Sequence, residues 1–224
     1  MLDSQRQDDG RSRLTEAQAR FEDLNADLIL KARSVLNRIV SSPEVHPRLI
    51  NTLSMLEHMG SHKIMATQHG HAIDQATLRH LAEECHHAFF MKRQAEKAAG
   101  RRLEYEPRDL LAPASARMYF QRLEASMARR LEQEGSAGAA YLYMSMIIEF
   151  RAVWFYTLYQ HALDRFDHPM SLKRLLGEEQ NHLTAMAERL DHTGELSDPR
   201  IDAFISEEHQ LFSRFLDSLQ RHLN

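Results

Sequence analysis

Apolar residues recur every three or four positions along most of this chain, which is the spacing of one face of an α-helix. The first such segment runs through Phe21, Leu28 and Leu36. Later segments repeat the spacing, and short stretches rich in Pro, Gly, Asp and Ser separate them. The pattern predicts an all-α fold, with helices over residues 14–40, 48–68, 74–99, 115–134, 137–166, 170–192 and 198–223.

The ends of these segments carry helix signals. Asp74 is expected to be the N-cap of the helix over residues 74–99, and Gly100 follows that helix at the position of a C-cap glycine. The stretch "RRLEYEPRDLLAPAS" after Gly100 is expected to be a crossing connection. Residues 1–13 are polar and are expected to form a disordered tail. The remaining residues, 14–224, are long enough for a single domain with one sizeable core.

Composition narrows the class of protein. Apolar residues make up 43% of the 224 residues and charged residues 27%, as in soluble globular proteins. A net charge of −4 without a basic block gives no footprint for nucleic acid, and no apolar run is long enough for a membrane span. The single cysteine, Cys85, excludes an internal disulfide, and the N-terminus lacks the apolar core of a signal peptide. We therefore expect a cytoplasmic protein.

One phrase occurs twice. "LAEECHHAFFM" begins at Leu81, and "LGEEQNHLTAM" begins at Leu176, 95 positions later. Both contain Glu-Glu followed by two variable residues and His. A Glu and a His three residues later lie one turn apart on the same helix face, so one helix can present both to a metal ion. The repeat predicts two helix pairs of similar construction.

Each phrase is preceded by a glutamate inside an apolar run. Glu57 lies 27 residues before Glu84, and Glu149 lies 30 residues before Glu179. An uncompensated carboxylate in an apolar setting is costly, and a cation shared with other carboxylates would compensate it. Two close divalent cations need about four carboxylates and two imidazoles. The candidate metal ligands are Glu57, Glu84, His87, Glu149, Glu179 and His182.

The first phrase leaves two registers open, because Glu83 with His86 has the same spacing as Glu84 with His87. The apolar stripe through Leu81, Cys85 and Ala88 and the analogy with the second phrase favour Glu84 and His87. Cys85 is interpreted as a small core residue pointing away from these ligands. A histidine-rich neighbourhood surrounds this phrase and is expected to be mostly solvated; it comprises His58, His62, His69, His71 and His80. Within it, His62 and His69 are secondary candidates for supporting or adventitious metal sites.

At the candidate ligands the chain resembles the ferritin-like di-metal carboxylate superfamily, over about residues 48–100 and 135–191. Within it, the chain is similar to the cyanobacterial aldehyde-deformylating oxygenases in its length, its long crossing segment and the phrases "YFQRLEASM" and "MIIEFRAVWFYTLY". The resemblance implies a four-helix bundle of two helix pairs joined by a long crossover. Additional N-terminal, crossover and C-terminal helices would surround it.

The resemblance also implies roles for the ligands. Glu84 and Glu179 would bridge two metal ions, Glu57 and Glu149 would be terminal carboxylates, and His87 and His182 would be nitrogen ligands. Tyr156 matches a tyrosine of the deformylating family and would support the site from outside the ligand set. Arg151 and Trp154 depart from that family, whose channel is lined by smaller or apolar residues. Arg151 is expected to pair with an acid on an outer helix, and the alternative is contact with an anionic substrate near an entrance.

These features predict a non-haem di-iron oxygenase or oxidase, with manganese as an alternative to iron and O2 as co-substrate. Its substrate would be a small, apolar organic molecule, and a ferredoxin or reductase would supply electrons. The alternative is an iron-handling ferroxidase similar to ferritins and rubrerythrins, which assembly into a large shell would favour. A bundle that lost its metal and a tRNA hydroxylase fit the sequence less well. The sequence leaves open whether the chain forms a homodimer.

Overall fold

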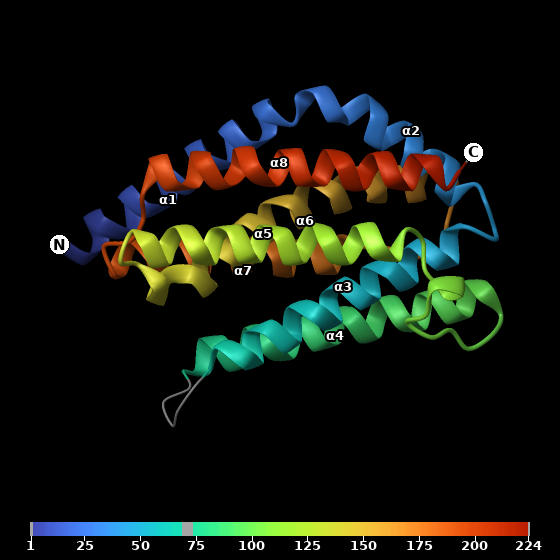
Figure 1. Ribbon diagram of the computed structural model, residues 1–224, viewed down its shortest axis with the longest axis horizontal. Coiled ribbons are helices and arrows are strands. Elements are labelled where there is room, and N and C mark those ends of the chain that lie inside the picture. Colours follow the sequence, from blue (N-terminus) through green and yellow to red (C-terminus); the bar gives the residue numbers. More distant parts are fainter. Residues whose placement is uncertain (1, 69–73, 224) are drawn as a thin grey trace. The chain divides into compact units, whose positions relative to one another are not determined.

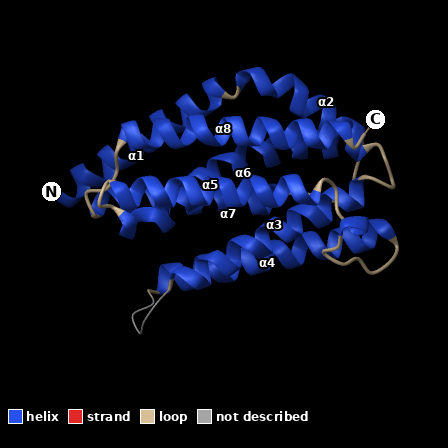
Figure 2. Ribbon diagram, in the orientation of Figure 1, coloured by secondary structure: helices blue, strands red, loops and turns tan. Residues whose placement is uncertain are grey.

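The computed structural model describes residues 2–68 and 74–223. Within these ranges the chain forms eight α-helices and three short 3-10 turns, and it contains no strand (Figure 2). The all-α fold class is therefore confirmed. None of the helices in the described ranges combines the length and apolarity needed to cross a bilayer. The helices are α1 (Leu2–Leu24), α2 (Ile29–Val40), α3 (His46–Thr67), α4 (Gln75–Ala99), α5 (Pro113–Gln133), α6 (Ala140–Arg165), α7 (Lys173–His192) and α8 (Asp198–Arg221).

The N-terminal region differs from the predicted pattern in two ways. Helix α1 begins at Leu2, inside the stretch 1–13 that the sequence sets apart as a tail. The helix expected over residues 14–40 is interrupted, because α1 ends at Leu24 and a 3-10 turn precedes α2.

The interruption lies at Asn25, which is fully buried. Its side-chain amide donates to the carbonyl oxygen of Phe21 at 2.8 Å. Its amide oxygen accepts from Arg151 at 2.5 Å, across 126 residues of sequence. Asparagine side chains compete with the backbone for hydrogen bonds and so favour helix ends over helix interiors. The apolar spacing continues through this residue, which is why periodicity alone did not reveal the break.

The predicted helix caps of α4 are confirmed. The carboxylate of Asp74 accepts a hydrogen bond from the backbone N–H of Thr77 at 2.7 Å. Gly100 adopts a left-handed conformation with φ of 63°, which a residue without Cβ reaches at little cost. The stretch His69–Ile73, expected to be a turn, lies outside the described residues.

The helices form two compact units. Unit 1 consists of the described residues of Met1–Ala32, Gln121–Gln160 and Leu172–Ser213. Unit 2 consists of those of Arg33–Phe120, His161–Ser171 and Arg214–Asn224. The prediction of a single domain over residues 14–224 stays a prediction.

Unit 1 has an aromatic core around a buried charge. Arg151 on α6 makes a two-pronged ion pair with Glu208 on α8, at 2.8 and 2.7 Å. The guanidinium carbon lies 3.8 Å from the ring centroid of Phe212 and 4.7 Å from those of Phe21 and Trp154. This is the acid on an outer helix that the sequence predicts for Arg151.

Unit 2 is built on α3 and α4, which lie side by side and run in opposite directions (Figure 1). The connection after α4 is tied to these helices by polar side chains. Asn51 on α3 donates to the carbonyl oxygens of Glu104 and Asp109 at 2.9 and 3.0 Å. Lys92 on α4 donates to the carbonyl oxygen of Leu103 and to the side chain of Asn51. The connection is irregular, but it is held in place because each of these backbone oxygens accepts a hydrogen bond.

Candidate metal-binding groups

The two glutamates of the α4 phrase face different environments. Glu83 forms an ion pair with Arg79 one turn earlier, at 3.0 Å on the outer side of the helix. Glu84 is buried, and so is His87, whereas His86 is exposed. Burial therefore selects Glu84 and His87 over Glu83 and His86 as the residues able to form an enclosed site.

Cys85 is exposed, which corrects its interpretation as a core residue. Its position, 100° around the helix from Glu84, carries it off the buried face.

Within unit 2, the buried pair on α4 meets a carboxylate from α3. Glu57, Glu84 and His87 each offer a ligand atom, and these atoms lie within 4.8 Å of one another. The Nδ1 atom of His87 is 3.8 Å from Oε1 of Glu84. A Cβ atom added at Gly60 would lie 3.5 Å from Oε2 of Glu84, so the carboxylate packs closely against α3. Glu57 itself is only half-buried.

His80 is the residue that sequence reasoning missed. The sequence places it among histidines expected to be mostly solvated, but the structure buries it, and its Nε2 atom lies 3.3 Å from Oε1 of Glu84. The signal was present in the sequence as the spacing of His80, Glu84 and His87. Positions separated by four and then three residues share one helix face.

The two glutamates of the α7 phrase also lie in different surroundings. Glu178 pairs with Arg174 one turn earlier, at 2.9 Å and near solvent. Glu179 and His182 are buried, with 1% and 4% of their surface exposed. In both phrases the first glutamate therefore binds an arginine on the outside of the helix and the second points inward. The two adjacent glutamates of each phrase therefore lie in different surroundings.

Within unit 1, His182 lies between two carboxylates. Its Nδ1 atom is 3.1 Å from Oε2 of Glu179 and 3.3 Å from Oε1 of Glu149, which extends from α6. Burial by itself would lower the pKa of His182, but hydrogen bonds and charge from Glu149 and Glu179 outweigh it and raise the pKa to about 12. The imidazolium thus supplies one positive charge that the two buried carboxylates share.

Groups of mostly buried glutamates and histidines in the described part of the chain could hold a metal ion. Two carboxylates balance the charge of a divalent cation, and a neutral imidazole adds a donor without adding charge. A metal ion would take the place of the proton on His182, because a nitrogen ligand must present its lone pair. These donor types suit iron, manganese and zinc and do not select among them.

The remaining predicted site residues have varied surroundings. Tyr156 is buried on α6, and its ring centroid is 6.2 Å from that of Phe155. Its supporting role stays a prediction. His58 and His62 are exposed, and their rings meet edge to face at 4.5 Å. His69 and His71 lie outside the described residues.

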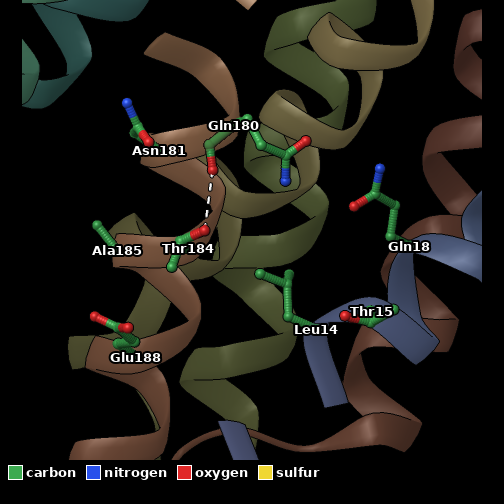
Figure 3. A pocket seen from close by; sticks show the side chains of 8 residues that line it. All are labelled: Leu14, Thr15, Gln18, Gln180, Asn181, Thr184, Ala185 and Glu188. Atoms are coloured by element: carbon green, nitrogen blue, oxygen red, sulfur yellow. Dashed lines mark hydrogen bonds between the residues drawn. The ribbon is translucent and has the colours of Figure 1, made fainter. Parts of the chain in front are cut away.

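A surface pocket of about 530 Å³ lies in unit 1 between α1 and α7 (Figure 3). Its lining is mostly amide and hydroxyl groups, including those of Gln18, Gln180 and Thr184. At 100° per residue, Gln180 lies about 100° and Thr184 about 140° around the α7 axis from Glu179. The lining of the pocket is therefore largely polar, and it includes neither Glu179 nor His182.

Comparison of the chain with family models, with curated proteins and with solved structures gave no match.

Proposed function

We propose that this chain is a non-haem oxidoreductase that uses two divalent metal ions, iron or manganese, to activate O2 for the oxidation of a small organic substrate. The group on α3 and α4 and the group on α6 and α7 would each hold one ion. When bound, such ions supply the redox chemistry that protein side chains lack. The candidate ligands are those of the sequence repeat: Glu57, Glu84, His87, Glu149, Glu179 and His182.

The observation that carries this proposal is the burial of Glu149, Glu179 and His182 in contact with one another. Buried ionised groups are costly, and structures retain them where they pair or coordinate metals. Here two carboxylates converge on one imidazole nitrogen. A purely structural role would be served as well by apolar residues of similar volume.

The protein would contribute orientation and exclusion of water. Glu84 and Glu179 are presented by rigid helices, and the arginines one turn earlier keep the neighbouring Glu83 and Glu178 on the outside. The two outer glutamates thus do not compete for the same ion. A ferredoxin or reductase as electron donor remains part of the proposal, as does an apolar substrate.

Metal content tests the proposal. Protein loaded anaerobically with Fe(II) or Mn(II) should hold about two ions per chain, as measured by inductively coupled plasma mass spectrometry. The double variant Glu84→Ala, Glu179→Ala should lose both. The matched control is Glu83→Ala, Glu178→Ala, which removes the neighbouring carboxylates of the same two helices and should leave binding intact.

Consumption of O2 by the reduced, metal-loaded protein would then identify the chemistry, with aldehydes, acids and amines as candidate substrates. Absence of bound metal in the wild type would refute the proposed function. Oxidation of added Fe(II) without any organic substrate, by a large multi-subunit shell, would favour iron handling.

A further inference from the structure

Helix α4 exposes a line of apolar side chains to solvent. Leu78 and Phe89 keep 50% and 59% of their surface exposed. Ala82 and Cys85 lie between them and are also exposed. The four positions are separated by four, three and four residues, which is the spacing of a seam along which one helix packs against another.

This line continues at its two ends with opposite charges. Asp74 lies four residues before Leu78, and Arg93 lies four residues after Phe89; both are exposed. The guanidinium carbon of Arg93 lies 5.8 Å from the ring centroid of Phe89, so the positive charge stands over the end of the apolar line. At 100° per residue, all six side chains fall within about 100° of the helix circumference. We call them the outer stripe: Asp74, Leu78, Ala82, Cys85, Phe89 and Arg93.

The outer stripe is separate from the candidate metal ligands of the same helix. His87 lies about 180° around the helix axis from Leu78, and Glu84 lies about 120° from it. His87 and Glu84 are buried, whereas the residues of the outer stripe are exposed. A molecule bound along the outer stripe would therefore leave the acid-and-imidazole group of α4 on the other side of the helix.

The order of residues in the outer stripe is complementary to itself. A two-fold rotation centred between Glu83 and Glu84 pairs α4 with an antiparallel copy and sets each residue against the one equally far from the centre on the other side. A carboxylate then meets a guanidinium, and a large apolar side chain meets another. The small side chains meet at the centre, where they allow the helix axes to approach to about 8–10 Å. The pairs, each formed twice, are Asp74 with Arg93, Leu78 with Phe89, and Ala82 with Cys85.

We propose that the outer stripe binds a second copy of this chain, and that the two α4 helices pack antiparallel about a two-fold axis. Exposed apolar side chains gain free energy when they are withdrawn from water together. A parallel pair would instead set Asp74 against Asp74 and Arg93 against Arg93, and like charges in contact oppose association. The dimer needs no metal ion and is independent of the proposed function.

The proposed contact is small. The outer stripe spans 19 residue steps of helix, about 29 Å. A contact made by one helix of this length is at the low end of protein interfaces, so the dimer should dissociate on dilution.

Sedimentation velocity of the full chain tests the proposal. Across about a hundredfold range of protein concentration, the wild type should pass from one chain to two. Phe89→Ser should weaken dimerisation more than about tenfold, because it removes two copies of one apolar contact. Leu30→Ser is the matched control, because Leu30 on α2 is 79% exposed and lies outside the outer stripe. It should leave dimerisation unchanged.

The single cysteine of the chain tests the orientation of the two helices. In the antiparallel pair the two copies of Cys85 are three residue steps apart along the helix axes, about 4.5 Å. A short bismaleimide should therefore link them in the wild-type dimer. In the double variant Cys85→Ser, Leu78→Cys the two thiols would be about 16 Å apart along the axes, and linking should be lost. A parallel pair would be linked equally in both proteins.

A wild type that stays monomeric over the whole range would overturn the proposal. A dimer weakened equally by Phe89→Ser and Leu30→Ser, or by neither, would overturn the assignment to the outer stripe. Equal linking of the two cysteine variants would overturn the antiparallel arrangement. Phe89 and Leu30 are both exposed, so both variants should keep the fold, which circular dichroism checks.

Discussion

The α3–α4 pair and the α6–α7 pair carry the same acid-and-imidazole pattern but support it differently. Glu149 on α6 is 4% exposed, whereas its counterpart Glu57 on α3 is half-buried. Two residues after Glu149, Arg151 forms a buried ion pair with Glu208, while the corresponding residue after Glu57 is Met59. Unit 2 instead bonds α3 to the connection after α4 through neutral amides such as that of Asn51.

The contrast shows that a ligand pattern can be repeated while its scaffold is stabilised by different interactions. The pattern depends only on the spacing of residues along a helix. The scaffold depends on what each helix packs against, and in unit 1 this includes a fully desolvated charge pair. The two halves should therefore respond differently to mutation, to pH and to removal of metal.

The largest expected effect concerns the buried ion pair of unit 1. Glu208→Ala leaves the guanidinium of Arg151 buried without its carboxylate, and this should lower the free energy of unfolding by about 3–5 kcal/mol. Urea denaturation followed by circular dichroism measures the change. Glu207→Ala, at the adjacent and more exposed position, is the control and should change the stability by less than about 0.5 kcal/mol. Equal losses in the two variants would show that the pair contributes nothing specific.

Low pH should reduce stability through protonation of His46, which lies in unit 2. Burial, and next the nearby charge of His168, lower the pKa of His46 from 6.5 to about 4. The folded protein therefore holds this imidazole neutral, while the unfolded chain binds a proton below about pH 6.5. The free energy of unfolding should fall as the pH decreases from 6.5 to 4, by up to about 3 kcal/mol from this residue.

The measurement is the difference in the pH dependence of stability between the wild type and His46→Gln. Above pH 7 the two should differ by a constant amount. Between pH 6.5 and 4 the wild type should lose more stability than the variant. Parallel curves over the whole range would contradict a neutral, buried His46.

Glu57 and Glu149 lie on the first helix of their respective helix pairs. Substituting each of them compares the two candidate metal-binding groups in the absence of metal. In the presence of a chelator, Glu149→Ala removes one carboxylate from the buried His182 and should cost about 1–3 kcal/mol. Glu57→Ala removes a half-buried carboxylate and should cost less than about 0.5 kcal/mol. Urea denaturation of both variants tests the difference. A larger loss for Glu57→Ala would reverse the order of burial described above.

The smallest effect is expected at the helix starts. The N-terminus of α4 is capped by the side chain of Asp74, whereas the N–H of Leu172 before α7 is bonded to the buried side chain of Gln160 at 2.6 Å. Asp74→Ala should cost about 1 kcal/mol, and Asp74→Asn, which keeps an acceptor, a few tenths. Thermal unfolding of the two variants measures the difference. An equal loss of stability in both would show that the charge of Asp74, and not its capping hydrogen bond, stabilises the helix.

Much of the fold could be predicted from the sequence because helices are governed by local interactions. The three-four spacing of apolar residues predicted most of the helices, and Asp74 and Gly100 marked the ends of α4. The spacing of Glu84 and His87, and of Glu179 and His182, placed each pair on a common helix face. Each inference uses residues within one or two turns of one another, whose relation is set by 3.6 residues per turn.

Other features depended on residues far apart in the chain. The break at Asn25 depends partly on Arg151, 126 residues away, and the apolar spacing, which continues through Asn25, did not reveal it. Cys85 proved exposed and His80 buried, although their apolar and polar character suggested the reverse. Which side of a helix is covered is decided by the elements packed against it. The sequence by itself determined the helices and the paired acids and imidazoles, and tertiary packing decided which side chains are withdrawn from water.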